Sequence, residues 1–555
     1  MTTRRDVLRT LTASALLPAA GLGNSEALAA HAGAESCGCN TVLTQEQRTV
    51  ILDQAILLLE ANYVHLSDKR KRHNIDPVAR LKELRERLIG TQPLGDTTAF
   101  HDEVDEIFTS ARDRHLRYAR CDSKCFAYLP FDVRQIYEQG KPLYVAASID
   151  AKRVDPEFRN GVRLVTWNGL PINAVVQSQA ALEAGSTMDA CRALALQTLT
   201  TRTLRYDGFP REEKIKVGFS TNGEIKEHPF AWTFVHGASP GVLPTLIAFF
   251  TGLTSRDEDP KLALLKELRE IRLTAISEAF PPKPCADFRR VELQYPKVFE
   301  ARDYTISGKP YGYIRIHRFD KKIPEGLFEE VFVDYLHRMP EGGLILDIRD
   351  NPGGWINSGE RLLQTLPTKK PRIKPETFDM RNTRFNADVC QRDAQLRAWW
   401  PSVDKGWRAG IPYSERLPKT DEEACNVRGM VYKHPVVLVT DALTYSAGDI
   451  FAAGFQDHEI GPVLGVHPTT GGGGAAAWSQ DQAGKRYWPG TPYQELPEGV
   501  SMMTAHRRSF RVYKNQDKVL EDAGVRRDAE HLPTLNDVLN CDADLIAKAA
   551  SLFRA

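Results

Sequence analysis

Apolar residues in the N-terminal part of the chain recur with a period close to that of an α-helix. Ile51, Leu58 and Tyr63 belong to one such face, and Arg and Glu residues are interleaved with the apolar ones in the segments that follow. Because this pattern continues to residue 120, the sequence predicts an N-terminal helical domain at 45–125.

The pattern then changes to short runs typical of β-strands. The segments 143–147 and 162–167 are rich in β-branched and aromatic residues, and Asn168-Gly169 after the second run is a turn signal. We therefore expect a small β-rich module at 128–235.

Strands and helices are expected to alternate in the C-terminal half. The run 343–348 is apolar on both faces, as a strand in a sheet covered on both sides requires. A connecting segment at 236–300, with a helix at 261–279, precedes this region. The prediction is a multi-domain, mixed α/β protein whose core spans 301–555 and carries an insertion with several tryptophans at 371–430.

The first 29 residues have the layout of an export signal. Arg4-Arg5 is followed by an apolar stretch and by the small-residue site Ala27-Leu28-Ala29. We interpret 1–29 as a Tat-type signal peptide and expect a periplasmic or secreted protein; the alternative is an N-terminus that carries two arginines by chance. No stretch reaches about 18 uninterrupted apolar residues, so no integral membrane segment is expected in the mature chain.

Charge and cysteine content narrow the possible functions. Lys and Arg number 73 against 72 Asp and Glu, so nothing predicts a nucleic-acid partner. Nine cysteines in an exported chain permit disulfides, and Cys121/Cys125 and Cys390/Cys425 are candidate pairs. Cys37-Gly38-Cys39 has no second cluster at zinc spacing, and we expect neither a metal nor a cofactor.

Two short segments carry features suited to acyl chemistry. Asp347–Gly354 follows the buried strand, and its two glycines permit a sharp turn that leaves amides free to face an anion. Ser446 starts a helix after the apolar strand 436–440, with the small residues Ala447 and Gly448 next to it. Taken separately, the first segment has an ordinary explanation as a tight turn and Ser446 as a helix N-cap.

Together these segments resemble the S41 peptidases, the family of carboxyl-terminal processing proteases and tricorn-type core proteases. An Asp-x-Arg-x-Asn-x-Gly-Gly run and a later Ser-Ala-Gly-Asp/Glu helix start occur there in the same order, and Gly461–Gly472 and Leu520–Val525 fit the same pattern. The resemblance implies a ClpP/crotonase-like core, with Ser446 as the nucleophile. It also implies an oxyanion hole formed by the amide of Ala447 and that of Gly353 or Gly354.

The resemblance also indicates how the serine is activated. The lysine base of the processing proteases is absent, because Thr469-Thr470-Gly471 continues into further glycines, which we expect to form a flexible loop near the cleft. The segment Ala111–Leu116 is similar to the Asp-x-His element of the tricorn-like branch, which implies that His115 is the general base. Glu521 stands where that branch has the carboxylate that orients the histidine. Arg114 departs from the pattern, which leaves a fourth catalytic side chain open.

These observations predict an exported serine endopeptidase that acts on protein or peptide substrates through Ser446, His115 and Glu521. A non-catalytic binding protein on the same scaffold and an esterase with the same triad are the alternatives. The β-rich module is similar in part to a PDZ domain, for which a generic β module is the alternative. The oligomeric state, the substrate preference and a lid or zymogen role of 371–430 stay open.

Overall fold

The computed structural model describes most of the chain outside the N-terminal segment and the connecting segment. The described residues are 42–90, 95–121, 125–208, 210, 212–235, 261, 265–266, 288–290, 294–480 and 492–553. The predicted signal peptide, Cys37-Gly38-Cys39 and most of the helix expected at 261–279 lie outside these ranges. Within them, no helix is both long and apolar enough to cross a bilayer.

Four helices form the N-terminal domain, as the periodicity predicts. Their buried faces carry the recurring apolar residues, including Ile51, Leu58 and Tyr63. Asp76 and Asp96 cap the third and fourth helices by accepting backbone N–H groups. The helices are α3 (Gln45–Ala61), α4 (Leu66–His73), α5 (Pro77–Ile89) and α6 (Thr97–Ser110).

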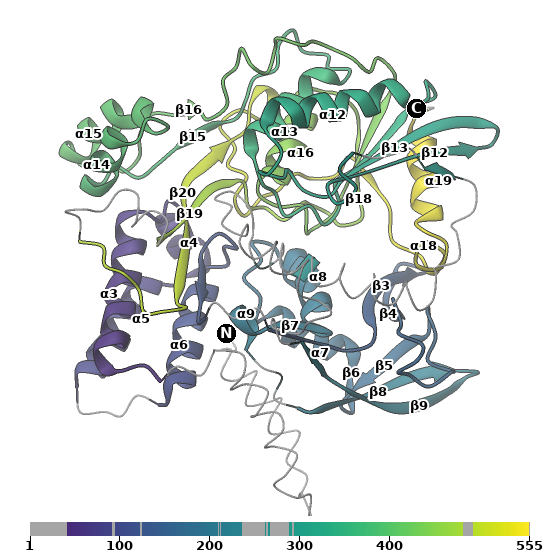
Figure 1. Ribbon diagram of the computed structural model, residues 1–555, viewed down its shortest axis with the longest axis horizontal. Coiled ribbons are helices and arrows are strands. Elements are labelled where there is room, and N and C mark those ends of the chain that lie inside the picture. The colour runs from purple at the N-terminus through teal and green to yellow at the C-terminus, as the bar shows by residue number, and fades with distance from the viewer. Residues whose placement is uncertain are drawn as a thin grey trace, which may run out of the picture.

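The β-rich module contains a six-stranded antiparallel sheet and a three-stranded one (Figure 1). Asn168 and Gly169 both have positive φ, 49° and 77°, and make the predicted turn between two strands. The large sheet is formed by β3 (Asp132–Glu138), β4 (Lys141–Ala147), β5 (Arg163–Trp167), β6 (Leu170–Pro171), β8 (Lys214–Thr221) and β9 (Glu224–Ala231). The small sheet and the helices are β2 (Phe126–Tyr128), β7 (Thr201–Thr203), β10 (Thr233–Val235), α7 (Ile172–Ala180), α8 (Met188–Thr198) and α9 (Leu204–Asp207).

The core is a seven-stranded sheet with helices on both faces (Figure 1). Leu346 and Leu438 face the cluster that includes α12, α13 and α16, whereas Ile345 and Val437 face α19, which explains why these strands are apolar throughout. Its strands are, in order across the sheet, β11 (Phe288–Arg290), β12 (Phe299–Ile306), β13 (Lys309–Ile316), β14 (Leu344–Asp347), β17 (Val436–Thr440), β18 (Val463–Gly465) and β21 (Ala529–Glu530). Its helices are α12 (Glu325–Arg338), α13 (Ile356–Leu362), which continues as η1 (Leu363–Thr365), α16 (Ala447–Asp457), α18 (Leu535–Leu539) and α19 (Ala543–Leu552).

A second sheet joins the core to the helical domain. β1 (Arg117–Ala119), which directly follows the helical domain, pairs with β20 (Ser501–Phe510), and β20 also pairs with β15 (Thr377–Asp379) and β19 (Ala475–Ser479). β16 (Leu417–Pro418) completes this sheet beside β15, and η3 (Tyr513–Asn515) follows β20. This pairing fixes the end of the helical domain against the core.

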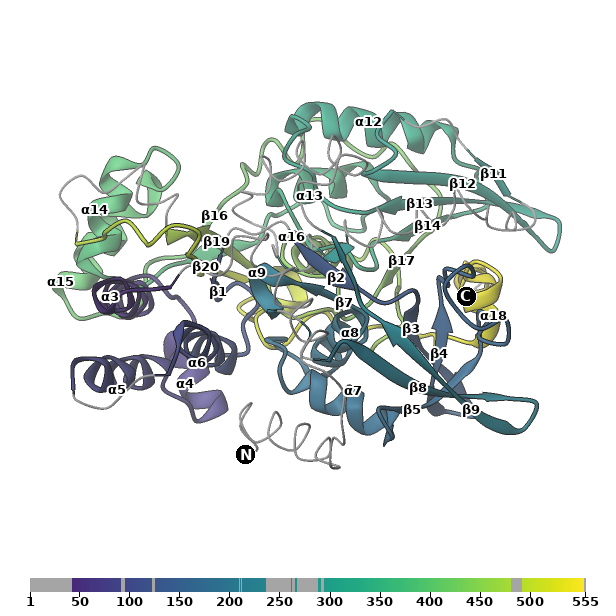
Figure 2. The same ribbon diagram turned by 60° about the horizontal axis from the view of Figure 1, so that its bottom comes forward.

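The insertion 371–430 contains β15, β16 and three helical segments that lie beside α3 in both ribbon views (Figures 1 and 2). The Asn62 side chain donates to Asn386 Oδ1 at 2.9 Å across this contact. On the core side, the Glu360 carboxylate of α13 accepts the Glu376 N–H at 2.7 Å and the Thr420 hydroxyl. The helical segments are α14 (Arg384–Arg392), η2 (Arg397–Trp399) and α15 (Trp400–Arg408).

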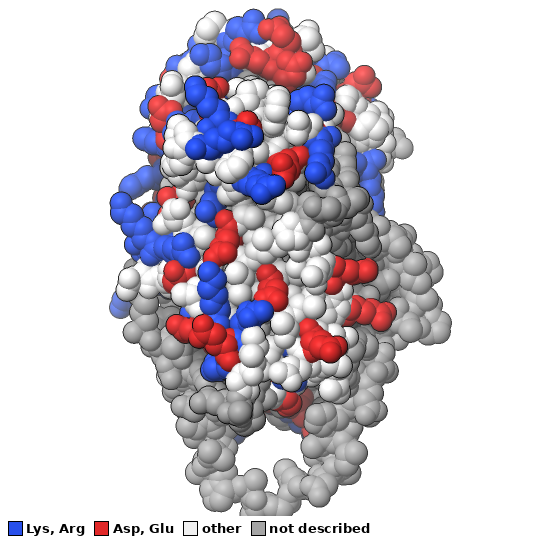
Figure 3. Space-filling model, turned by 90° about the vertical axis from the view of Figure 1, so that its left-hand side faces the viewer, with Lys and Arg blue, Asp and Glu red and all other residues white. Residues whose placement is uncertain are grey.

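Basic and acidic side chains intermingle on the face formed by the helical domain and the insertion (Figure 3). This mixture matches the near-neutral composition of the chain.

Two sequence-based expectations need correction. Cys390 and Cys425 are free, buried thiols rather than a bridge, whereas Cys121 and Cys125 are each disulfide-bonded. The glycines at 471–474 are buried and tightly packed rather than a flexible loop: a Cβ on Gly473 would lie 1.8 Å from the Tyr445 ring.

Candidate active site

The glycine turn after Asp347 and the turn at Ser446, for which the sequence predicts a role in acyl transfer, lie side by side. They follow β14 and β17, which are neighbouring parallel strands, so both turns leave the same edge of the sheet. Tyr445 N donates to Asn351 O at 2.9 Å, and Thr444 Oγ1 donates to Ile348 O at 2.9 Å. These bonds hold the glycine turn against the serine turn.

The two glycines differ in what their amides can do. Both have positive φ, 105° at Gly353 and 125° at Gly354. The Gly353 N–H donates to Asn351 Oδ1 at 2.9 Å. Phe319 bonds to Gly353 O and to the Trp355 N–H, and the Gly354 N–H has no backbone acceptor among the described residues. A Cβ at Gly354 would lie 2.0 Å from Phe319 O, so only glycine fits there.

Ser446 sits in a strained backbone conformation at the start of α16. Its φ is 57° and its ψ is −122°, a combination that non-glycine residues rarely adopt. The side chain makes no capping hydrogen bond, although serine is a common N-cap. The hydroxyl is therefore directed elsewhere, beside the first amide of α16, that of Ala447, which has no partner within the helix.

His115 reaches this serine from the helical domain. Its loop lies between α6 and β1, and His115 Nε2 is 3.0 Å from Ser446 Oγ. The Tyr445 ring lies 4.9 Å from the imidazole, centroid to centroid, and the Tyr445 hydroxyl accepts the Arg114 N–H at 3.2 Å. The Arg114 guanidinium also lies over the Tyr445 ring, 4.3 Å from the ring centroid. These contacts align the histidine loop with the serine turn.

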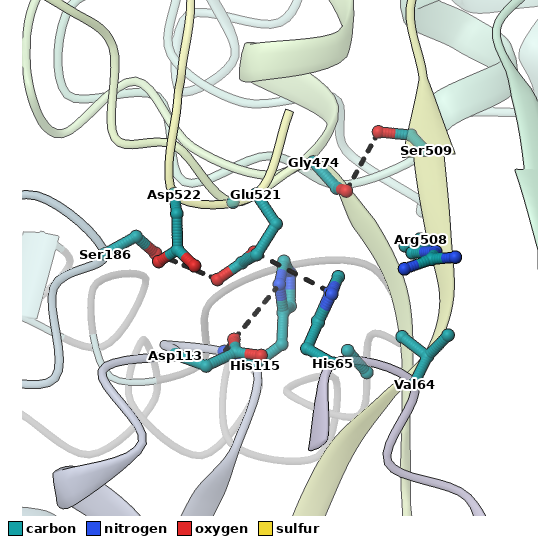
Figure 4. Close-up of polar contacts among 12 residues, drawn as sticks. Val64, His65, Asp113, His115, Ser186, Gly474, Arg508, Ser509, Glu521 and Asp522 are labelled. Atoms are coloured by element: carbon teal, nitrogen blue, oxygen red, sulfur yellow. Dashed lines mark hydrogen bonds and ion pairs between the residues drawn. The ribbon is translucent and has the colours of Figure 1, made fainter. Parts of the chain in front are cut away.

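Asp113 holds the backbone of the histidine loop (Figure 4). Its Oδ1 accepts the His115 N–H at 2.7 Å and lies 4.0 Å from His115 Nδ1, and its Oδ2 accepts the Tyr63 hydroxyl at 2.9 Å. Burial acts to raise the pKa of Asp113, but His65, Lys69, His115 and the amide hydrogen bond outweigh it and lower that pKa below its usual value. Asp113 is thus a buried, ionised carboxylate next to the imidazole.

Glu521 belongs to the same buried cluster. Its Oε1 accepts from Lys69 Nζ at 2.6 Å and from Ser186 Oγ at 3.1 Å, and its Oε2 lies 3.8 Å from His65 Nε2 (Figure 4). Burial and the negative charge of Asp113 raise the pKa of Glu521 well above its usual value. Of the residues predicted from the sequence, the structure thus brings Ser446 and His115 into hydrogen-bond distance and puts Glu521 next to Lys69, Ser186 and His65.

Lys69 is the residue of this cluster that sequence analysis missed. It is fully buried although it belongs to the run Lys69–His73, which is typical of a solvated helix face. Burial acts to lower the pKa of Lys69, but Glu521, Asp113 and Asp522 outweigh it and raise that pKa. Lys69 is therefore a permanent cation here and not a general base. Its partners lie some 450 positions away, so no local signal identifies it.

Asp449 links the serine helix to the glycine run. Its carboxylate accepts the N–H groups of Gly472 at 3.3 Å and Gly473 at 2.8 Å. Burial raises the pKa of Asp449 to about 6. The glycine run thus packs on Tyr445, directly before Ser446, and is held by Asp449, in the first turn of α16.

A metal ion has one conceivable position among the described residues. His65, Asp113 and Glu521 each offer one ligand atom, and these atoms lie within 4.8 Å of one another. The Lys69 ammonium already provides a positive charge next to this position, because it is bonded to Glu521 at 2.6 Å. We therefore infer that the Lys69 ammonium balances the negative charge of this cluster.

Two family models and several solved structures match parts or most of the chain. Residues 310–486 match the model of peptidase family S41, and residues 126–241 match that of a PDZ domain. The solved structure of mature CPAF complexed with lactacystin is 18% identical, with a TM-score of 0.66 over 92% of this chain and 98% of that chain. A second structure of mature CPAF is 17% identical, with a TM-score of 0.65 over the same shares. No curated protein sequence matches the chain.

The chain contains a peptidase family S41 segment at residues 310–486. It is therefore a serine-type peptidase, and its β-rich module is a PDZ domain. The predicted family and the predicted mixed α/β, multi-domain fold class are confirmed. The match to the S41 model ends before Glu521 and begins after His115, so both residues stand outside the matched segment.

Proposed function

We propose that this protein is an exported serine endopeptidase in which Ser446 attacks the peptide carbonyl carbon, His115 transfers the proton, and Glu521 supports the imidazole. The observation that carries the proposal is the 3.0 Å contact between His115 Nε2 and Ser446 Oγ, made by a serine in a strained conformation. A hydroxyl that close to an imidazole nitrogen can pass its proton to it as the oxygen attacks.

The steps follow from the positions of the donors. Ser446 Oγ bonds to the carbonyl carbon while its proton moves to His115 Nε2, and the resulting oxyanion accepts N–H groups from Ala447 and Gly354. His115 then protonates the leaving amine, which gives the acyl-enzyme. Water deprotonated by the same nitrogen hydrolyses the ester and regenerates Ser446. We favour Gly354 over Gly353 because Asn351 already takes the Gly353 N–H.

Negative charge next to the histidine stabilises the imidazolium that forms in both steps. Asp113 lies 4.0 Å from Nδ1, and Glu521 belongs to the same buried cluster. Ser446 and His115 are both fully enclosed in this conformation, so a substrate carbonyl reaches the hydroxyl only when a neighbouring segment moves.

Two variants test this proposal. Ser446→Ala and His115→Ala should each lower turnover of casein by at least about 10³-fold, since the residues act as one unit. Ser67→Ala and His337→Ala, at exposed positions, are the matched controls. Undiminished casein hydrolysis by purified Ser446→Ala protein would refute the assignment. Faster turnover of small acyl esters than of casein would favour an esterase, and a Ser446 that is inert to a serine-directed phosphonate would favour a binding protein.

Export is a separate part of the proposal. Its support is the sequence of residues 1–29, with Arg4-Arg5 ahead of an apolar stretch. In a bacterial host with the Tat system, the double substitution Arg4→Lys and Arg5→Lys should keep the full-length protein in the cytoplasm. Equal periplasmic yield of the variant and the parent protein would argue against this route.

A further inference from the structure

The two oxygens of the Glu521 carboxylate have different surroundings. Oε1 accepts from Lys69 Nζ at 2.6 Å and from Ser186 Oγ at 3.1 Å. Oε2 is buried and receives no hydrogen bond from the residues that the structure describes, and it faces His65 at 3.8 Å (Figure 4). One oxygen is thus held by two hydrogen bonds, and the other lies next to His65.

The two donors come from the two domains that flank the core. Lys69 belongs to α4 of the helical domain, and Ser186 belongs to the PDZ domain at 126–241. Both side chains are buried, at 0% and 6% exposure. The carboxylate therefore has its donors in place only when both domains are docked on the core.

The Lys69 ammonium also contacts the loop that carries His115. Its three acceptors are Glu521 Oε1, Asp522 Oδ1 at 2.6 Å and the backbone oxygen of Arg112 at 3.0 Å, which matches the three donors of an ammonium group. Arg112 is three residues before His115, so the Lys69 ammonium holds both the turn that carries Glu521 and the loop that carries His115. A loss of this cation would loosen both at once.

Lys69 also affects the pKa of Glu521. Asp113 and Asp522 both act to raise the pKa of Glu521, and Lys69 acts against them. Burial lowers the pKa of His65 to about 3, so this imidazole is neutral and contributes no positive charge. Arg72 and His73 are each 3.8 Å from the Asp522 carboxylate and bind that residue instead. Lys69 is the cation hydrogen-bonded to Glu521 among the described residues.

We propose that Lys69 and Ser186 are positioning residues of the peptidase, which clamp Oε1 of Glu521 from two domains and so fix the carboxylate in the buried cluster beside the histidine loop. This inference rests on the proposed function, since it assigns a role to the carboxylate that supports His115. Lys69 additionally opposes the rise in the pKa of Glu521 that burial, Asp113 and Asp522 cause. Neither residue touches the reacting atoms, so both act through Glu521 and the histidine loop.

The test compares the pH dependence of kcat/KM for a peptide substrate in two lysine variants. Lys69→Met keeps an unbranched side chain, one atom shorter, but removes its charge, and Lys71→Met does the same at an exposed position of α4. Loss of the cation favours protonation of both Glu521 and His115, so the acid limb should move to higher pH by about 1 to 3 units. The loss should fall on kcat rather than KM. Lys71→Met should keep the parent profile.

Two further variants show whether the effect passes through Glu521. In a Glu521→Gln background, Lys69→Met should cost much less than in the parent protein, because the group it acts on is already neutral. Ser186→Ala removes one hydroxyl without burying a charge and should lower kcat by up to about tenfold, whereas Ser67→Ala should not. Circular dichroism checks that each variant is folded.

Each outcome decides the inference. The inference is overturned if folded Lys69→Met protein keeps the acid limb of the parent pH profile. It is also overturned if Lys69→Met shifts that limb equally in the Glu521→Gln background and in the parent protein. If Lys69→Met does not fold, Ser186→Ala decides: unchanged kcat rejects the clamp. A Ser446→Ala protein that stays active rejects the proposed function itself, whereas an inactive one combined with an unaltered Lys69→Met profile rejects the clamp alone.

Discussion

The two halves of the candidate active site are held by different physical means. Ser446 is fixed by backbone geometry: parallel strands, a positive φ of 57° and glycines packed within van der Waals contact of Tyr445. His115 is fixed by side-chain hydrogen bonds and buried charge from Tyr63, Asp113 and Lys69. The serine half should therefore be sensitive to changes of shape, and the histidine half to changes of charge.

The largest expected effect is a change of shape in the serine half. Gly354→Ala would bring a Cβ within 2.0 Å of Phe319 O at a φ of 125°, so the turn must move and with it the proposed oxyanion donor. Loss of one such donor lowers kcat by about 10² to 10³-fold. Steady-state kinetics on a peptide substrate measures this.

Gly359→Ala is the matched control. This glycine lies in α13, where a Cβ would make ordinary contacts of 3.4 Å with Phe319. We expect kcat within about twofold of the parent value, because alanine favours the helix by up to about 1 kcal/mol. Equal losses in both variants would mean that the turn is not specially constrained.

A change of charge in the histidine half comes next. Asp113→Asn keeps the shape and an acceptor for the His115 N–H but removes the charge 4.0 Å from Nδ1. A charged hydrogen-bond partner contributes about 1.5 to 3 kcal/mol, so kcat/KM should fall by roughly 10- to 100-fold. Protonation of the imidazole becomes less favourable, so the acid limb should move to lower pH, opposite to Lys69→Met. A shift of the same sign in both variants would contradict the charge argument.

Glu360 extends the comparison to a buried carboxylate that is bonded by an amide and a hydroxyl instead of an ammonium. Burial raises the pKa of Glu360 to about 7, whereas a glutamate in the unfolded chain titrates near 4.3. The folded state thus holds an extra proton between these values. Its contribution to stability is complete below about pH 4.3 and is lost at about 1.4 kcal/mol per unit as the pH rises to about 7.

Urea unfolding at several pH values measures this contribution. Glu360→Gln should lack that slope relative to the parent protein, while Glu330→Gln, at an exposed position of α12, should keep it. Parallel curves for all three proteins would show that Glu360 is ionised in the folded state.

The smallest expected effect concerns the contact between the halves. Tyr445→Phe removes the hydroxyl that accepts the Arg114 N–H at 3.2 Å but keeps the ring beside His115. One neutral hydrogen bond contributes about 1 kcal/mol, so kcat should fall by about fivefold. A loss beyond about 10²-fold would mean that the hydroxyl takes part in the chemistry.

The serine half could be predicted from sequence because its determinants are local. The apolar strand 436–440, the helix start at Ser446 and the glycine turn after Asp347 lie in short runs with their own periodicity and spacing. The structure has β17 at Val436–Thr440 and α16 from Ala447 onward. His115 and Glu521 were predicted through family resemblance, since neither residue carries a local signal.

The histidine half could not be completed from sequence for a physical reason. Lys69 looks like its solvated neighbour Lys71, and only tertiary contacts with Glu521 and Asp522 make it a buried cation. Burial of the glycines at 471–474 likewise depends on Tyr445 and Asp449, which lie outside the run. The thiols of Cys390 and Cys425 are buried separately, although their shared region suggested a bridge.

The wide spacing of the three side chains has a consequence for biosynthesis. His115 leaves the ribosome early, Ser446 follows 331 residues later, and Glu521 emerges near the C-terminal end. A nascent chain therefore holds an incomplete set of reactive groups for nearly the whole of translation. In the proposed mechanism an unfinished copy lacks Glu521, so cutting ability arises only once the last tenth of the polypeptide has folded back onto the first domain.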